Sequence, residues 1–282
     1  EDGAGNPPNP NGVKTDYLWR EILTPARLTD IIENYAQTTE EKDDRGRRKR
    51  RQIFPRYHQL QVVRKFLADA VVTGVGKRYL IQHSAGSGKS NSIAWLAHQL
   101  IGLLRHGAPV FDSVIVVTDR RILDKQIRDT IKQFAQVSAT VGHAESSGDL
   151  RRFLASGKKI VITTVQKFPF ILDEIGDEHR GSKFAIIIDE AHSSQGGRTA
   201  AKMNIALTAD SGGDEEETPE DVINRIMESR KMLKNASYFA FTATPKNKTL
   251  ETFGEAFEEA GKVKHRPFHS YTMKQAIQEG FI

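Results

Sequence analysis

Short runs of consecutive apolar residues recur along the chain, separated by longer segments in which apolar residues stand at helical spacing. The runs are Tyr79–Gln82, Val114–Val117, Lys159–Val165, Phe184–Ile188 and Tyr238–Phe241. A strand that is apolar at nearly every position has both faces covered, as is typical of a parallel sheet between two layers of helices. The pattern therefore predicts an α/β fold with a parallel sheet flanked by helices.

The first helical segment is predicted to begin at Thr24-Pro25, because threonine is a good N-cap and proline fits the first helical position. Its buried face is predicted to consist of Leu28, Ile31, Ile32 and Tyr35. A second helix is predicted after Gln59, and a third over the apolar positions between Ile93 and Leu104. A fourth is predicted between Ile122 and Phe134.

The segment Arg78–Ser90, RYLIQHSAGSGKS, contains a strand at Tyr79–Gln82, a glycine-rich turn and the start of a helix near Lys89. Gly86 and Gly88 lack a Cβ, so the backbone can take positive φ and direct its N–H groups at an anion. This order predicts a phosphate-binding loop in which Lys89 reaches the β and γ phosphates and Ser90 holds Mg²⁺. The residues predicted to bind ATP are Gln59, Ala85, Gly86, Ser87, Gly88, Lys89 and Ser90.

Two residues of the predicted nucleotide site, His83 and Gln59, also allow interpretations without a nucleotide. His83 stands where the usual motif has glycine, so the alternative is a Gly/Ser turn that contains GKS by chance. Gln59 lies one helix upstream of the loop, where a glutamine can read adenine with one donated and one accepted hydrogen bond. The alternative for Gln59 is a glutamine on the surface of a helix.

Two carboxylates, Asp189 and Glu190, follow the strand Phe184–Ile188 in the sequence DEAH. Carboxylates at the end of a buried strand are costly unless a cation or a reaction requires them. Asp189 is predicted to hold Mg²⁺ together with Ser90, and Glu190 to orient and deprotonate the attacking water. With Lys89, they form the predicted catalytic set, although DEAH alone could be a simple exit from a strand.

Composition excludes several classes of protein and leaves others open. The 282 residues include no cysteine, which excludes disulfides and thiolate metal sites, and no helical histidine pair suggests zinc. The net charge of +5 suggests an anionic partner. No signal peptide or long apolar run is visible, so we expect a cytoplasmic protein without a membrane partner. The charged run Glu40–Arg51 is interpreted as a solvated linker or a contact to phosphate backbone, and Asp210–Asp221 as a loop.

The phosphate loop, DEAH and the sequence FTATP at Phe241–Pro245 resemble motifs I, II and III of superfamily 2 helicases and translocases. The flanking sequences FPRYHQ at Phe54–Gln59 and ITTVQKF at Ile162–Phe168 look like the restriction (R) subunit of type I restriction-modification enzymes. So do HSSQ after Ala191, the last twelve residues, and Asp16–Tyr35. The resemblance implies a RecA-like P-loop NTPase domain whose ATP hydrolysis drives translocation on double-stranded DNA before the intact subunit cleaves it. It also implies methyltransferase and specificity subunits as partners.

The resemblance assigns further roles in DNA binding and in coupling hydrolysis to movement. The residues concerned are Thr118, Arg120, Arg121, Thr163, Thr164, Gln166, Lys167, His192, Gln195, Thr242 and Thr244. Each has a bland alternative: the two arginines as first-turn helix residues, Thr163 and Thr164 as β-branched strand formers, and Thr242 and Thr244 as caps of the turn before Pro245.

The resemblance also suggests how the chain is divided. Residues 1–52 are expected to be a helical linker segment that follows a nuclease domain, and residues 53–265 the first RecA-like motor domain. Residues 266–282 are expected to connect to a second RecA-like domain. We find no nuclease constellation in the N-terminal segment and no arginine-bearing motif of a second motor domain, so we expect a part of a larger subunit. The alternatives are another superfamily 2 DNA or RNA helicase and a nucleotide-gated nucleic-acid-binding module.

Overall fold

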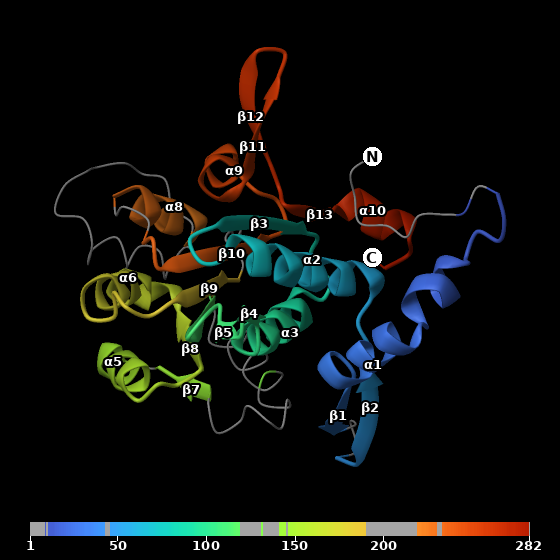
Figure 1. Ribbon diagram of the computed structural model, residues 1–282, viewed down its shortest axis with the longest axis horizontal. Coiled ribbons are helices and arrows are strands. Elements are labelled where there is room, and N and C mark those ends of the chain that lie inside the picture. Colours follow the sequence, from blue (N-terminus) through green and yellow to red (C-terminus); the bar gives the residue numbers. More distant parts are fainter. Residues whose placement is uncertain are drawn as a thin grey trace.

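A sheet of seven parallel strands forms the centre of the molecule (Figure 1). The computed structural model describes residues 9, 11–42, 46–118, 131, 141–144, 146–189, 219–229 and 233–281. In spatial order the strands are β13 (His269–Tyr271), β3 (Arg78–His83), β10 (Ala236–Thr242), β9 (Phe184–Ile188), β6 (Ser113–Thr118), β8 (Ile160–Thr164) and β7 (Val141–His143). The predicted α/β class and all five predicted strands are therefore confirmed.

Helices cover both faces of the sheet, because successive residues of each strand point to opposite sides. In β6, Val114 and Val116 join one apolar cluster, and Ile115 and Val117 join the other. The first cluster includes residues from two long helices, α2 (Tyr57–Thr73) and α3 (Lys89–Ile101). The second includes residues from α5 (Ser147–Ala155), α6 (Phe168–Asp177), α8 (Pro219–Ser229) and α9 (Asn247–Phe253). The apolar runs of the sequence thus mark strands that are buried on both faces.

The N-terminal segment packs on the α2–α3 side through a short helix. A π-helical turn, η1 (Leu18–Ile22), is followed by α1 (Pro25–Asn34), with Thr24 at its N-cap as predicted. Only part of its predicted apolar face is buried: Ile31 and Tyr35 enter the core, whereas Leu28 and Ile32 are 37% and 57% exposed. The helix contacts the domain along one edge, where the carbonyl of Tyr35 accepts a hydrogen bond of 2.9 Å from the indole of Trp95.

The charged run Glu40–Arg51, interpreted from the sequence as a solvated linker or a contact to phosphate backbone, contains residues of two strands. It lies within an antiparallel hairpin of β1 (Gln37–Lys42) and β2 (Arg48–Ile53). The register places Glu40 opposite Arg50 and Glu41 opposite Lys49.

The expected connector, residues 266–282, supplies part of the domain itself. Its strand β13 pairs with β3 along the edge of the main sheet, and α10 (Met273–Gln278) follows. Before it, β11 (Glu255–Glu259) and β12 (Lys262–Arg266) form a hairpin that projects from the body of the domain (Figure 1). The remaining elements are a two-residue pair, β4 (Leu104–Arg105) with β5 (Ala108–Pro109), and a turn of 3₁₀-helix, η3 (Val165–Lys167). Among the helices described, none is long and apolar enough to cross a membrane.

Candidate nucleotide-binding site

The glycine-rich turn between β3 and α3 has the backbone conformation of an anion-binding loop. Gly86 has a φ of +76° and Gly88 a φ of +80°, both in the left-handed region that side chains other than glycine rarely adopt. Helix α3 begins at Lys89, and no side chain caps its N-terminus. The first N–H groups of a helix have no partners within the helix, so this start is suited to an anion.

Lys89 is held inside the loop rather than extended into solvent. Lys89 is only 9% exposed, and its Nζ lies 3.4 Å from the carbonyl oxygens of both His83 and Ser84. These are long contacts, so the ammonium can exchange them for stronger charge-assisted bonds to phosphate. The donor set of the loop fits the phosphates of a nucleotide: a buried ammonium, two glycines of positive φ and an uncapped helix start.

Gln59 holds the outer side of the same loop. Its Nε2 donates to the carbonyls of Ser87 at 3.3 Å and Gly88 at 2.9 Å, and its Oε1 accepts from the N–H of Arg56 at 2.8 Å. Gln59 is 3% exposed, so it is not the helix-surface glutamine of the alternative interpretation. The contact is close, because a Cβ added to Gly88 would lie 2.4 Å from this Nε2.

Sequence reasoning missed His58, the residue beside Gln59. Its Nε2 lies 3.0 Å from the carbonyl of Ser87, and its ring stacks on Tyr271 with a centroid separation of 3.9 Å and an interplanar angle of 6°. Burial lowers the pKa of His58, and the hydrogen bond to Ser87 opposes that shift only in part. The aromatic partner lies 213 residues away (Tyr271 minus His58), so no local sequence pattern could reveal the contact.

A pair of imidazoles, those of His83 and His269, lies beneath the loop. Nε2 of His83 is 2.8 Å from Nδ1 of His269, whose Nε2 is 3.2 Å from Oε1 of Gln61. Burial lowers the pKa of His269 to about 3 and that of His83 well below its ordinary value. His83, the residue that departs from the usual motif, is therefore a neutral core histidine that joins β3 to β13.

Asp189 lies where the sequence places it, directly after β9. It is 2% exposed, and its N–H donates to the carbonyl of Val117 at 2.8 Å, which fixes the backbone at the carboxyl ends of β6 and β9. In a parallel sheet this edge is also where β3 enters the phosphate loop, so Lys89 and Asp189 belong to the same side of the molecule. Glu190, His192, Gln195, Arg120 and Arg121 lie outside the described residues.

The predicted DNA-contacting residues divide by exposure. Thr118 and Thr163 are fully buried near the ends of β6 and β8. The hydroxyl of Thr118 donates to the carbonyl of Thr163 at 3.5 Å, and that of Thr163 donates to the carbonyl of Ala144 at 3.4 Å. Thr242 is also buried in β10, whereas Thr164 and Lys167 are half-buried, and Gln166 and Thr244 are exposed. Lys167 lies across the end of β8, where its Nζ contacts the carbonyl of Ala144 at 3.3 Å.

A family model for the SWI2/SNF2 ATPase matches residues 58–282, which is most of the chain. The chain belongs to the SWI2/SNF2 ATPase family. The resemblance to superfamily 2 motors expected from the sequence is thereby confirmed, and the family's description as an ATPase supports the use of a nucleotide by this domain.

Curated relatives of this SWI2/SNF2 ATPase are endonuclease subunits of type I restriction enzymes. A subunit from Staphylococcus aureus (strain MSSA476) is 24% identical over 280 residues, which cover 96% of this chain and 25% of the relative. A putative subunit from Methanocaldococcus jannaschii is 26% identical over 248 residues, which cover 82% of this chain and 19% of the relative. The chain thus spans about a quarter or less of the length of these relatives.

Solved structures similar to this SWI2/SNF2 ATPase domain include a helicase and an ATPase core. The UvsW helicase from bacteriophage T4 matches with a TM-score of 0.43 and 15% identity, over 83% of this chain and 67% of that one. The Sulfolobus solfataricus SWI2/SNF2 ATPase core in complex with dsDNA matches with a TM-score of 0.44 and 13% identity, over 71% of this chain and 35% of that one.

Proposed function

We propose that this domain is the ATP-binding motor domain of a type I restriction enzyme endonuclease (R) subunit, in which ATP hydrolysis drives translocation along double-stranded DNA. The observation that carries the proposal is the phosphate loop, closed on its outer side by Gln59 and holding Lys89 inside. The names of the type I restriction enzyme relatives support the assignment to that class of motor. The proposal places the subunit in the cytoplasm with methyltransferase and specificity subunits.

The residues of the site would divide the chemistry of hydrolysis between them. Lys89 and the backbone N–H groups of Gly86–Ser90 would hold the phosphates, while Ser90 and Asp189 would hold Mg²⁺. The metal, when bound, neutralises negative charge on the phosphates. Glu190 would orient and deprotonate the water that attacks the γ-phosphate. Hydrolysis then depends on positioning and charge stabilisation by these fixed groups.

Adenine recognition by Gln59 would require an exchange of hydrogen bonds. Its amide already makes two donor contacts to the loop and one acceptor contact to Arg56. A Gln59 that reads the base must therefore release a loop carbonyl while nucleotide is bound. Gln59→Ala is expected to reduce the preference for ATP over GTP, and competition binding with both nucleotides measures it. An unchanged preference would contradict the adenine role.

Double-stranded DNA is the proposed second ligand. Binding through phosphates is insensitive to sequence and weakens steeply with salt. The exposed basic strand β2, with Lys49, Arg50 and Arg51, is one candidate contact. We expect Lys49→Ala/Arg50→Ala/Arg51→Ala to weaken DNA binding, measured at two salt concentrations. The matched control is Lys262→Ala/Lys264→Ala/Arg266→Ala in the other exposed hairpin. Equal loss in both variants, or a salt-independent affinity, would count against a specific contact by β2.

Hydrolysis by this domain alone should be slow. In related nucleotide hydrolases an arginine from a neighbouring domain raises the rate by about 10³–10⁵. The resemblance places that arginine in a second RecA-like domain. The test is steady-state phosphate release by this domain and by the intact subunit, each with and without duplex DNA. DNA-stimulated turnover by the isolated domain at the rate of the intact subunit would show that the proposed division of the active site is wrong.

A further inference from the structure

We propose that His58 is a positioning residue for the phosphate loop, held in place by Tyr271 from the opposite end of the domain's sequence. The inference rests on the proposed nucleotide site and adds to it a residue that no motif of the loop contains. The contact that carries it is the 3.0 Å distance from Nε2 of His58 to the carbonyl oxygen of Ser87.

This contact defines the tautomer of His58. A carbonyl oxygen can only accept a hydrogen bond, so Nε2 of His58 must carry the proton and donate it. Nδ1 of His58 is then the unprotonated nitrogen, and it has no hydrogen-bond partner among the described residues. His58 is fully buried, so its neutral ring cannot rotate into solvent to find another acceptor. The ring therefore acts as a fixed donor aimed at the loop.

The loop needs such a donor because its two carbonyls must point outward. When backbone N–H groups turn inward to form an anion nest, the carbonyls of the same peptides turn away from the anion. His58 and Gln59 both contact the carbonyl of Ser87. Gln59 also donates to the carbonyl of Gly88, which accepts in addition from the N–H groups of Asn91 at 3.1 Å and Ser92 at 3.4 Å. Two adjacent residues of α2 thus hold the peptides that the left-handed glycines bring into position.

Tyr271 fixes the plane of the imidazole. Its ring stacks on His58 at 3.9 Å, and its backbone carbonyl accepts a hydrogen bond of 2.9 Å from the N–H of Ser84 in the loop. Tyr271 is therefore joined to the loop twice, once through His58 and once through the backbone. The ring of Phe281 lies edge-on to that of His58, with a centroid separation of 6.2 Å.

A carboxylate at the end of α10 holds Tyr271 in turn. Glu279 accepts hydrogen bonds from the hydroxyls of Tyr57 and Tyr271, the latter at 2.9 Å, and from the amide of Gln275 at 3.0 Å. Burial raises the pKa of Tyr271 to about 12, and the bond to Glu279 contributes to this, so the hydroxyl remains a donor. A continuous series of contacts thus runs from α10 through Tyr271 and His58 to Ser87.

The first test separates the donor from the ring. His58→Phe keeps an aromatic ring against Tyr271 but cannot donate, whereas His58→Gln loses the ring but carries an amide N–H near the position of Nε2. His58→Asn is the matched control, because its amide reaches only the position of Nδ1. We expect Mg-ADP affinity about tenfold weaker in His58→Phe and His58→Asn, as for a lost hydrogen bond to a buried group, and near wild type in His58→Gln. Isothermal titration calorimetry gives the affinities.

The second test observes the imidazole and the loop directly, without relying on an affinity. In ¹⁵N NMR spectra of the wild-type domain, His58 is expected as the Nε2–H tautomer at pH 7, with and without Mg-ADP. Hydrogen exchange at the amides of residues 84–90 should be faster in His58→Phe than in wild type, without nucleotide present.

The outcomes are separable. A wild-type domain that does not bind Mg-ADP would overturn the proposed function itself. Wild-type binding with equal affinity in His58→Phe, or an Nδ1–H tautomer in the wild type, would overturn the positioning role alone. If His58→Phe does not fold, the tautomer and the affinity of His58→Gln against His58→Asn still decide the proposal.

Discussion

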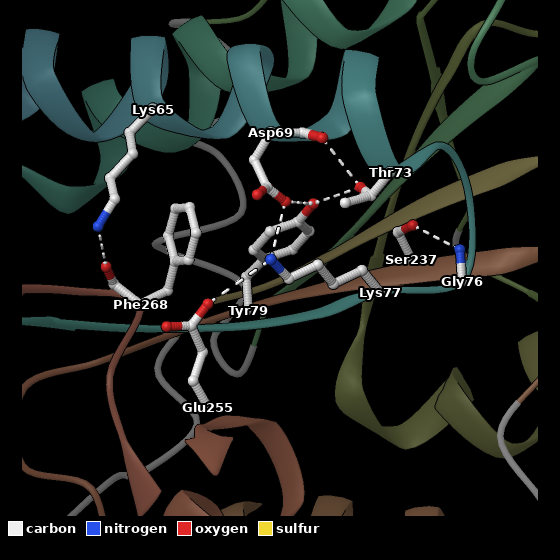
Figure 2. A network of polar contacts seen from close by, with 9 residues as sticks. All are labelled: Lys65, Asp69, Thr73, Gly76, Lys77, Tyr79, Ser237, Glu255 and Phe268. Carbon is white, nitrogen blue, oxygen red and sulfur yellow. Dashed lines mark hydrogen bonds and ion pairs between the residues drawn. The ribbon is translucent and has the colours of Figure 1, made fainter. Parts of the chain in front are cut away.

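Helix α2 and the strand that follows it, β3, have buried or partly buried polar groups at both ends, but the two ends differ in how many of these groups have hydrogen-bond partners. Near the C-terminal end of α2, Asp69 accepts hydrogen bonds from Lys77 at 2.9 Å and from the hydroxyl of Tyr79 at 2.7 Å (Figure 2). Lys77 also lies 3.5 Å from Glu255 in the projecting hairpin, and the hydroxyl of Thr73 donates to the carbonyl of Asp69 at 2.9 Å. Each of these side chains has a partner within the described part of the domain.

The opposite end, beside the phosphate loop, contains buried polar atoms without hydrogen-bond partners among the described residues. They are Nδ1 of His58, Nδ1 of His83, and the hydroxyls of Ser84 and Ser87. Buried polar groups normally find partners, because an unmade hydrogen bond is costly. One end of this helix and strand therefore contributes to stability, whereas the other end keeps buried donors and acceptors that a ligand could bind.

The largest expected effect is a loss of nucleotide affinity on replacing Lys89 at the loop, compared with Lys77 at the other end. Lys89→Ala removes the ammonium from the loop, and we expect about a 100-fold loss of Mg-ADP affinity, since hydrogen bonds to charged groups contribute about 1.5–3 kcal/mol. Lys77→Ala is the matched control at the other end and should keep the affinity while lowering the unfolding free energy. Calorimetric titration and urea denaturation of both variants measure the two effects. Equal nucleotide binding by wild type and Lys89→Ala would refute the ligand-binding role of that end.

Asp69→Ala should produce the complementary result. It removes the shared acceptor of Lys77 and of the buried Tyr79, and we expect a loss of about 2 kcal/mol in unfolding free energy with unchanged Mg-ADP affinity. Burial alone would raise the pKa of Asp69, but the bonds from Lys77 and Tyr79 outweigh it and lower the pKa. This contribution is therefore present above the unfolded pKa and is lost as the pH falls through the folded pKa.

The control for Asp69 is Asp221→Ala, which breaks an exposed ion pair with Lys246. Exposed pairs contribute about 0–1 kcal/mol, so this variant should unfold close to the wild type. A loss of nucleotide affinity in Asp69→Ala would mean that the two ends do not divide their tasks.

Two glycines of nearly equal φ separate the strain of an alanine from its contact with Gln59. Gly88 has a φ of +80° and Gly107 a φ of +79°, but a Cβ at Gly107 would meet nothing within 4 Å. Both alanine variants should lose about 1–2 kcal/mol of stability from the left-handed backbone. Only Gly88→Ala should also displace the amide of Gln59, and we expect Mg-ADP affinity to fall about tenfold as the loop carbonyls lose that donor. Affinity retained in Gly88→Ala would show that Gln59 does not hold the loop.

The smallest expected effect concerns the imidazoles beneath the loop. Burial lowers the pKa of His269 to about 3, so the folded protein keeps it neutral while the unfolded chain takes up a proton near pH 6.5. The unfolded state then binds more protons, and stability falls as the pH decreases below 6.5 toward 3. His269 should contribute about 0.7 kcal/mol of lost stability between pH 7 and pH 6. His269→Gln should reduce that dependence in denaturation curves, and an unchanged slope would contradict the neutral state.

The sheet was predictable where its strands are apolar on both faces. Val114–Val117 and Phe184–Ile188 need no tertiary information, because a continuous apolar run between helices has few other solutions. The short edge strands β7 and β13 were missed, since Val141–His143 and His269–Tyr271 are too short to show a period. The hairpin β1–β2 was missed because its residues are charged, although the opposite charges of Glu40 and Arg50 could have suggested pairing.

The site was predictable where spacing along the chain carries the chemistry. Asp189 directly follows strand β9, and Lys89 and Ser90 open helix α3 after the glycine-rich loop that follows β3. The contact of His58 with Tyr271 and the pair of His83 with His269 depend on β13 lying beside β3. Nothing in the local sequence encodes that adjacency, because it arises only when the whole sheet is assembled.

The position of β3 has a consequence for how the domain forms during synthesis. Leu80 pairs with Ala240, which is 160 residues later (240 minus 80), and Ile81 pairs with His269, which is 188 residues later (269 minus 81). The strand that leads into the phosphate loop thus leaves the ribosome first among the strands of the sheet and acquires its neighbours last. Contacts of such sequence separation form slowly. The apolar segment at Tyr79–Ile81 therefore has no native strand partner until β10, which begins at Ala236, has been synthesised, and we expect nucleotide binding to follow that pairing.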